Sequence, residues 1–188
     1  MRIFVYEHVT GGGYAGEALP AFLADGEVMW RAMLADLTAI TGVEVISLRD
    51  DRLAPPAMPG ARVIATRAAT FADDFRHCLD AVDAVWLLAP ESGGLLEALS
   101  QAVLRAGKRL LGCHPQAVRI AASKTATAER LAARGVAVIP AHASPYRMRG
   151  ESAVVMKPDD GAGCQDTRLF PSLEAAEDWL LQAGEQPG

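Results

Sequence analysis

Short runs of apolar and β-branched residues alternate with segments of helical periodicity over the first part of the chain. The runs predict five strands, at 2–6, 43–48, 61–66, 83–89 and 109–111. Between them, apolar positions at helical spacing predict one long helix from the end of a glycine-rich loop (7–13) to about Ile40, and further helices at 71–81 and 93–106. This alternation is typical of an α/β fold. We therefore predict a doubly wound, mostly parallel sheet with helices on both faces.

The pattern changes near residue 118. Ser123 can cap a helix that runs to about Arg134, where Gly135 ends it. Residues 136–139 are expected to be extended, and strands are predicted at 153–157 and 167–170, joined by a glycine-rich turn and followed by a helix at 172–181. The sequence therefore predicts an α/β domain at 1–118 and a small α+β lobe at 119–188.

Composition narrows the class of protein. Hydrophobic residues make up 51% of the chain and charged residues 22%, as in an ordinary globular protein. A net charge of −5 disfavours nucleic acid or an anionic membrane as partner. The three cysteines (Cys78, Cys113 and Cys164) have no metal or disulfide spacing, which suits a reducing compartment. Because neither a leader nor a membrane-length apolar run is visible, we expect a cytoplasmic protein.

The segment 154–167 carries the most informative chemistry. An apolar strand ends at Lys157, and Pro158 stops it. Gly161 and Gly163 then leave the backbone free to bend and to bring N–H groups close to an anion. A lysine beside such a loop suits a polyphosphate. A β-hairpin with a glycine turn and a solvated lysine explains the same residues equally well, so the segment alone does not decide.

A second lysine stands upstream, in a related context. Ser123-Lys124 opens the helix of the second part, and Gly135-Val136-Ala137-Val138-Ile139-Pro140 follows it. The order and spacing of these motifs resemble the ATP-grasp superfamily. In that superfamily a lysine opens a helix, a Gly-Val-x-Val-x-Pro stretch follows, and a strand-end Lys-Pro precedes a glycine-rich lid loop.

The resemblance implies that Lys124 and Lys157 neutralise the phosphates of ATP. The lid loop over them would comprise Gly161, Ala162, Gly163 and Cys164. The same resemblance makes 1–118 a pre-ATP-grasp domain and 119–188 the first, N-terminal ATP-grasp subdomain. It also implies Mg²⁺ between the phosphates, held by carboxylates and often by an asparagine of a second lobe. Because the sequence contains no asparagine, we expect the metal ligands outside this chain and assign none within it.

Two segments of the first part are candidates for contact with the substrate. Tyr6-Glu7-His8-Val9-Thr10-Gly11-Gly12-Gly13 and Ala89-Pro90-Glu91 resemble the ATP-grasp branch that contains the tyramine–glutamate ligases of methanofuran-type cofactor biosynthesis. That resemblance implies a carboxylate and an amine as substrates, such as glutamate and an aromatic amine or amino acid. The amides of the glycine loop, with the N-terminus of the first helix, would hold an anionic group. Substrate contacts are then expected from Glu7, Gly11, Gly12, Gly13 and Glu91.

A competing interpretation uses the same glycines. Gly11, Gly13 and Gly16 fit the G-x-G-x-x-G fingerprint of dinucleotide-binding proteins, with Asp50 or Asp51 as ribose ligands. However, four residues separate the strand from the first glycine, and the acidic residues lie farther along the chain than the fingerprint requires. An ordinary glycine-rich turn is the simplest account of the match.

The sequence accounts for one lobe of the grasp. We therefore expect a piece of a longer ligase, one subunit of a split enzyme whose second chain supplies the missing lobe, or a degenerate relative. The function predicted is ATP-dependent carboxylate–amine ligation through an acylphosphate, with the 188-residue chain inactive by itself. The alternatives are a non-catalytic binding or regulatory subunit of a ligase complex and a dinucleotide-binding Rossmann protein.

Overall fold

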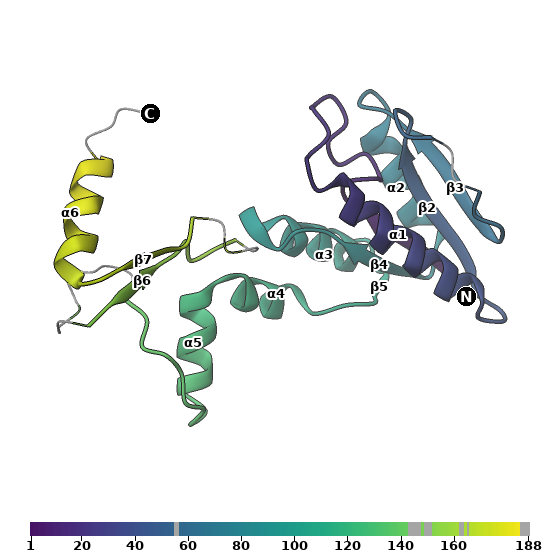
Figure 1. Ribbon diagram of the computed structural model, residues 1–188. Helices are drawn as coiled ribbons and strands as arrows, with labels where there is room; N and C mark the ends of the chain where they lie inside the picture. The colour runs from purple at the N-terminus through teal and green to yellow at the C-terminus, as the bar shows by residue number, and fades with distance from the viewer. Residues whose placement is uncertain (55–56, 143–147, 149–151, 162–163, 165, 185–188) are drawn as a thin grey trace. The chain divides into compact units, whose positions relative to one another are not determined.

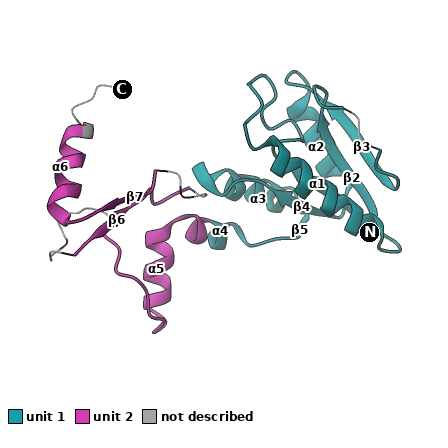
Figure 2. Ribbon diagram, in the orientation of Figure 1, with its two compact units in different colours: residues 1–118 teal, residues 119–188 magenta. Residues whose placement is uncertain are grey.

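The five apolar runs of the first part form one parallel sheet with the strand order β3-β2-β1-β4-β5 (Figure 1). The computed structural model describes residues 1–54, 57–142, 148, 152–161, 164 and 166–184. The chain divides into two compact units, Met1–Val118 and Arg119–Gly188 (Figure 2). The strands of the first unit are β1 (Arg2–Glu7), β2 (Glu44–Asp50), β3 (Ala61–Thr66), β4 (Ala84–Leu88) and β5 (Arg109–Leu110).

Helices cover both faces of this sheet. The chain first moves outward from β1 to β2 and β3, then returns to the other side of β1 for β4 and β5. Because parallel crossovers are right-handed, this reversal places the helices before and after it on opposite faces. Accordingly, α1 (Leu23–Thr38) packs on one face, and α2 (Phe71–Ala81) and α3 (Leu95–Arg105) pack on the other. The predicted doubly wound α/β fold is confirmed.

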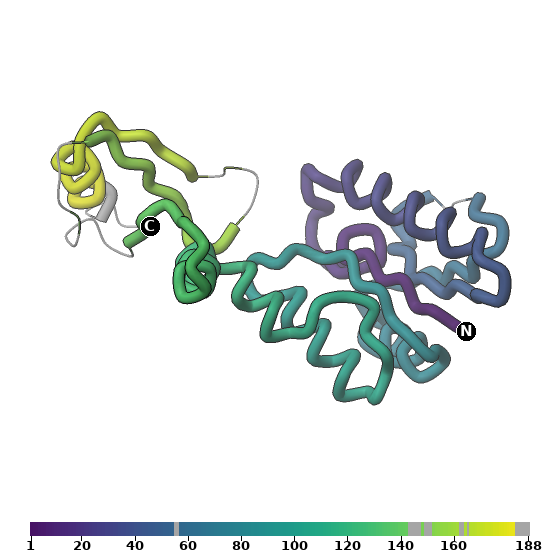
Figure 3. The backbone as a smooth tube through the Cα atoms, turned by 90° about the horizontal axis from the view of Figure 1, so that it is seen from below, coloured from purple at the N-terminus to yellow at the C-terminus, as the bar shows by residue number. Residues whose placement is uncertain are grey.

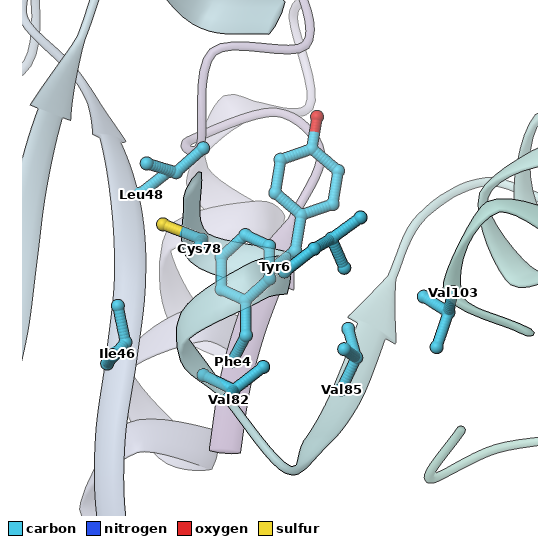
Figure 4. Close-up of a cluster of buried hydrophobic side chains, with 9 residues drawn as sticks. Phe4, Tyr6, Ile46, Leu48, Cys78, Val82, Val85 and Val103 are labelled. Atoms are coloured by element: carbon cyan, nitrogen blue, oxygen red, sulfur yellow. The ribbon is translucent and has the colours of Figure 1, made fainter. Parts of the chain in front are cut away.

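Alternate residues of the strands feed two separate hydrophobic cores. Phe4, Tyr6, Ile46, Leu48 and Val85 face α2 and α3, where Cys78, Val82 and Val103 meet them (Figure 4). On the other face, Ile3, Val5, Val45 and Ala84 pack against α1 through Trp30, Leu34 and Leu37. Burial on both faces explains why these strands read as continuous apolar runs.

The first helix is shorter than the sequence predicted. We expected it directly after Gly13, but α1 begins at Leu23, and the preceding residues form turns. Gly16 has a φ of 93°, a conformation that interrupts a right-handed helix. A second difference is α4 (Pro115–Ala122), which the sequence did not predict. It begins at a proline, a residue that suits the first turn of a helix because it needs no N–H donor there.

The second unit contains α5 and a hairpin on which α6 packs (Figure 3). Ser123 caps α5 (Lys124–Ala132), as predicted, by accepting a hydrogen bond from the Ala126 N–H. The strands β6 (Val154–Met156) and β7 (Arg168–Phe170) are antiparallel, and α6 (Leu173–Gly184) follows. Trp179 of α6 lies against Phe170, with 5.8 Å between the ring centroids. The extended stretch at 136–139 joins no strand ladder.

Candidate functional site

The start of α5 is bonded to the loop that follows β6. Asp159 is the centre of this contact: its Oδ2 accepts a hydrogen bond from Ser123 Oγ at 2.6 Å, and its Oδ1 accepts one from the Thr125 N–H at 2.7 Å. The Asp159 carbonyl also accepts from the Lys124 N–H at 3.1 Å. Asp159 therefore satisfies two amides that the first turn of a helix leaves without partners, the Thr125 N–H through its carboxylate and the Lys124 N–H through its carbonyl.

Lys124 reaches the same loop through its side chain. Lys124 is half-buried, and its Nζ donates to the carbonyl oxygens of Asp159 at 3.2 Å and of Gly161 at 2.9 Å. The structure thus brings together two elements of the predicted phosphate site, the helix-opening lysine and the start of the glycine loop. In this arrangement the ammonium group is bound to backbone carbonyls.

Lys157 directly follows β6 and is exposed. Among the described residues it takes part in no hydrogen bond or ion pair. The alternation along β6 places it on the same face as Val155 and opposite the face that packs on α6. An ammonium group at this point can accept an incoming anion without first losing a protein partner.

The loop after Lys157 has unusual backbone conformations. Gly161 has a φ of 118°, and a Cβ built there would meet nothing within 4 Å. Cys164 and Asp166 have φ values of 57° and 53°, a region that few residues other than glycine adopt. Ala162 and Gly163, which the sequence assigned to the lid, lie outside the described residues. The described part of the loop is exposed and contains residues with positive φ, and both features suit an anion-binding loop.

The positions of the few lysines in the chain also indicate the predicted phosphate site. Of the 18 basic residues only Lys108, Lys124 and Lys157 are lysines, and the other fifteen (18 − 3) are arginines. Lys108 donates to the carbonyls of Asp80 and Val82 and so has a structural role. Both remaining lysines belong to the predicted phosphate site. A compact ammonium group differs from the planar guanidinium in its binding of phosphate, so this bias was a signal that the sequence analysis had missed.

The first unit has a candidate site of its own, where the strand order reverses between β1 and β4. In open α/β sheets, ligands bind at this point, beyond the carboxyl ends of the strands. The His8 N–H donates to the Leu88 carbonyl at 2.8 Å, so the loops after β1 and β4 start side by side. The predicted substrate residues Glu7 and Glu91 therefore belong to the same edge of the sheet.

Glu7 is buried rather than solvated, with 1% of its surface exposed. Its carboxylate accepts hydrogen bonds from the Val9 N–H at 3.1 Å and the Thr10 N–H at 2.6 Å, and it lies against Gly26 of α1. A buried carboxylate costs free energy unless it is hydrogen-bonded, and these amides supply that compensation. In the described structure Glu7 holds the turn after β1.

The three glycines of this loop have a steric role. A Cβ on Gly13 would lie 2.2 Å from the His8 ring, and one on Gly11 would lie 2.5 Å from the Glu7 carbonyl. At Gly12, where φ is 91°, a Cβ would lie 2.7 Å from Thr66. We expected the amides of this loop to face an anion, but the Gly11 and Gly13 N–H groups donate to the carbonyls of Glu7 and His8, both at 2.8 Å. The α1 N-terminus also does not follow the loop directly.

Arg52 fixes the continuation of this loop. Its guanidinium donates to the carbonyls of Tyr14 at 2.9 Å and Glu17 at 2.6 Å. It also pairs with the buried carboxylate of Asp50, where the hydrogen bond from Arg52 lowers the carboxyl pKa. Residues 14–17 thus have a side-chain partner in place of regular secondary structure.

These contacts do not fit the dinucleotide-binding alternative, in which the glycine loop leads directly into a helix and an acidic side chain binds the ribose. Residues 17–22 separate Gly16 from α1, whereas the fingerprint requires the glycines to lead into the helix. Asp50, a predicted ribose ligand, already accepts three hydrogen bonds from Arg52, through the main-chain N–H and the guanidinium. The dinucleotide fingerprint is therefore a match in sequence letters without the matching structure.

His8 and Glu91 are two polar side chains of this edge that have access to solvent. His8 is half-buried, its Nδ1 lies 3.1 Å from the Tyr6 hydroxyl, and burial lowers its pKa despite the opposing charge of Glu7. Glu91 is exposed and precedes Gly93 and Gly94, which have φ values of 64° and 70°. His8 was not among the substrate contacts expected from the sequence.

Among the described residues, no three His, Cys, Asp or Glu side chains are grouped so as to hold a metal ion. The helices described there are all too short or too polar to cross a membrane.

Comparisons with known proteins support the fold described above. Residues 43–118 match the family model of the pre ATP-grasp 3 domain. The whole fold resembles a crystal structure described as that of an ATP-grasp superfamily protein from Archaeoglobus fulgidus, with a TM-score of 0.58 and 17% sequence identity. The match covers 85% of this chain but 47% of that protein, so the chain spans about half its length. No curated protein matches the chain.

Proposed function

We propose that this chain is the nucleotide-gripping part of an ATP-dependent carboxylate–amine ligase of the ATP-grasp type. The pre-ATP-grasp match and the shared fold support a relationship with this superfamily. On this proposal, 1–118 is the pre-ATP-grasp domain and 119–188 is the first grasp subdomain. The observation that carries the proposal is the contact of the Lys124 Nζ with the loop that begins after Lys157.

In the proposed site the two lysines bind the phosphates of ATP. Lys157 offers an exposed ammonium group, and Lys124 offers one that is held next to the loop. Gly161, Ala162, Gly163 and Cys164 would cover the phosphates with their backbone amides. When bound, ATP phosphorylates a carboxylate, and an amine then displaces the phosphate from the acylphosphate. Positive groups fixed near the phosphates stabilise the charge that develops in such a transfer. The Mg²⁺ ligands are proposed to lie outside this chain.

Activity would require the second lobe of the grasp. The chain spans 47% of the Archaeoglobus fulgidus protein, so the remainder would come from a longer chain or from a separate subunit. The isolated 188-residue chain is then expected to bind nucleotide without turnover. A cytoplasmic setting, where ATP is available, belongs to this proposal.

The acceptor substrate is proposed to bind at the switch point of the first unit. Glu91 is the candidate with direct access to solvent, whereas Glu7 and Gly11–Gly13 would shape the loop behind it. A carboxylate at this point suits an amine, so an aromatic amine such as tyramine, joined to glutamate, is the substrate pair we propose. Glu91→Gln should then weaken the binding of tyramine, while Glu44→Gln, at the opposite edge of the same sheet, should not.

Thermal unfolding with Mg·ATP tests the nucleotide site. A ligand that binds the folded state alone stabilises it by about 2.7 kcal/mol at a hundredfold excess over its Kd. We expect this stabilisation in the wild type and its loss in Lys157→Ala. Arg130→Ala is the matched control, because it removes an exposed cation from the same unit at the far end of α5. Equal ATP stabilisation of Lys157→Ala and wild type would exclude the lysine site.

The same experiment separates the alternatives. Stabilisation by NAD that persists in Lys157→Ala would favour a dinucleotide protein. Absence of any nucleotide effect would favour a non-catalytic subunit of a ligase complex, in which neither lysine is needed.

A further inference from the structure

Five hydrogen bonds join residues 123–125 to residues 159–161 in the second unit. Four of them use Asp159, two through its carboxylate and two through its carbonyl oxygen. The fifth joins the Lys124 Nζ to the Gly161 carbonyl. These hydrogen bonds connect the start of α5 to the loop after β6.

The surroundings of the Asp159 carboxyl group favour its ionised form. Hydrogen bonds from Ser123, then from Thr125, together with the charge of Lys124, lower the pKa of its carboxyl group. A negative charge is also favourable at the N-terminus of a helix, where the backbone amides are unpaired. The contact is therefore made by the ionised form, which prevails at neutral pH.

The position of Asp159 links the two lysines of the phosphate site. Lys157 lies two residues before it on the same short segment, and Lys124 lies between its two side-chain partners, Ser123 and Thr125. Because Pro158 restricts the backbone between Lys157 and Asp159, the distance between the two residues varies little. Fixing Asp159 on α5 therefore also fixes the backbone of Lys157 relative to α5.

We propose that Asp159 is the positioning residue of the nucleotide site, which holds the two backbone segments that carry Lys124 and Lys157 as one unit. This inference rests on the proposed function. Asp159 does not touch the phosphates; it acts through the two lysines. A site held together in advance gains affinity, because the lysines need not be ordered when the polyphosphate binds.

Removing Asp159 gives a result that simple electrostatics does not predict. An acidic group near a phosphate site repels a polyanion, so its loss alone should strengthen ATP binding. We expect the opposite: Asp159→Ala should weaken Mg·ATP binding about tenfold, the size of one charge-assisted hydrogen bond. Asp178→Ala, which removes an exposed carboxylate from α6, should leave the affinity unchanged.

A double-mutant cycle with Lys124 distinguishes positioning from a merely structural role. If Asp159 acts through Lys124, Asp159→Ala should change the affinity of Lys124→Ala by less than about twofold. A structural cap would instead lower the melting temperature of both backgrounds without changing the ATP affinity of the folded protein. Ser123→Ala, which removes one contact to the carboxylate and the cap of α5, serves if Asp159→Ala does not fold; it should weaken binding in the same direction.

The outcomes for the two proposals differ. Loss of ATP binding in Lys157→Ala with unchanged or tighter binding in Asp159→Ala would overturn the positioning role and leave the nucleotide site standing. Equal binding by wild type and Lys157→Ala, or no binding by the wild type, would overturn the nucleotide site and the positioning role with it.

Discussion

The two units differ in how they place their apolar side chains. The first buries them in cores on both faces of its sheet. In the second, Ala176 is the buried apolar residue among those described, while Ile139 is 88% exposed and Leu169 73% exposed. The α6 side of the hairpin has a partner in Trp179, but the Val155–Leu169 side has none among the described residues. The first unit therefore has hydrophobic cores that stabilise it, whereas the second leaves apolar side chains such as Ile139 and Leu169 exposed.

The largest expected difference between the units is the effect of deleting an apolar side chain. Trp30 is fully buried, and its Nε1 donates to Ser47 Oγ at 2.7 Å. Trp30→Ala should lower the free energy of unfolding of the first unit by about 3–5 kcal/mol. Leu169→Ala should change that of the second by about 0.5 kcal/mol or less. Urea unfolding followed by circular dichroism measures both, and comparable losses would show that the second unit has a core after all.

Each unit contains a carboxylate that accepts hydrogen bonds from backbone amides, and the stability effects of removing the two can be compared. Glu7→Gln leaves a buried amide without its acceptor and should cost about 1.5–3 kcal/mol. Asp159→Asn keeps an oxygen that can accept from the Thr125 N–H at an exposed position and should cost about 1 kcal/mol or less. The same unfolding experiment measures both variants. A larger loss for Asp159→Asn would contradict the role of burial in this difference.

The glycines of the two units are needed for different physical reasons. A methyl group on Gly13 would meet the His8 ring, so Gly13→Ala should destabilise the first unit by about 1–3 kcal/mol. Gly161 has open space around it and a positive φ, so Gly161→Ala should cost about 1 kcal/mol through the backbone alone. In ATP titrations the order should reverse, with Gly161→Ala the more harmful. An ATP affinity lowered more by Gly13→Ala would point back to the first glycine loop.

The smallest expected difference is in pH dependence. Burial lowers the pKa of His8, whose ring faces Tyr6, Glu7 and Tyr14. The folded state then resists protonation of His8, so its contribution to stability is complete above the ordinary pKa of 6.5 and is lost as the pH falls below it. His8→Gln should flatten this slope between pH 7 and pH 5. For Asp159, whose pKa is lowered from 3.8, the corresponding loss occurs in more acidic solution. An unchanged slope in His8→Gln would assign the effect to other groups.

The sequence predicted the strands well because parallel strands that are buried on both faces appear as short, continuous apolar runs. Ala61–Thr66 and Phe71–Ala81 agree at both ends with the prediction. The start of α1 was wrong, since Phe22 and Leu23 continue an apolar spacing that begins before the turn at Gly16. The contact of Arg52 with the carbonyls of Tyr14 and Glu17 also holds those residues outside the helix.

The candidate site was predicted in part. The resemblance gave Lys124 and Lys157, and the structure brings Lys124 to the loop after Lys157. Asp159 was missed because its partners lie more than thirty positions away in the sequence, at 123 and 125. Asp50 and Glu7 were assigned to ligands because the sequence does not reveal that Arg52 and the amides of Val9 and Thr10 already bind them.

The Arg52 contact has a consequence for the thermodynamics of binding at the first unit. A loop of this length without helix or strand would ordinarily lose much conformational entropy when a ligand orders it. Because Arg52 already fixes residues 14–17 on the buried Asp50, that loss has occurred during folding. A ligand at the switch point would then bind with a small entropic penalty, and calorimetry of wild type and Arg52→Ala would show the difference as a less favourable binding entropy in the variant.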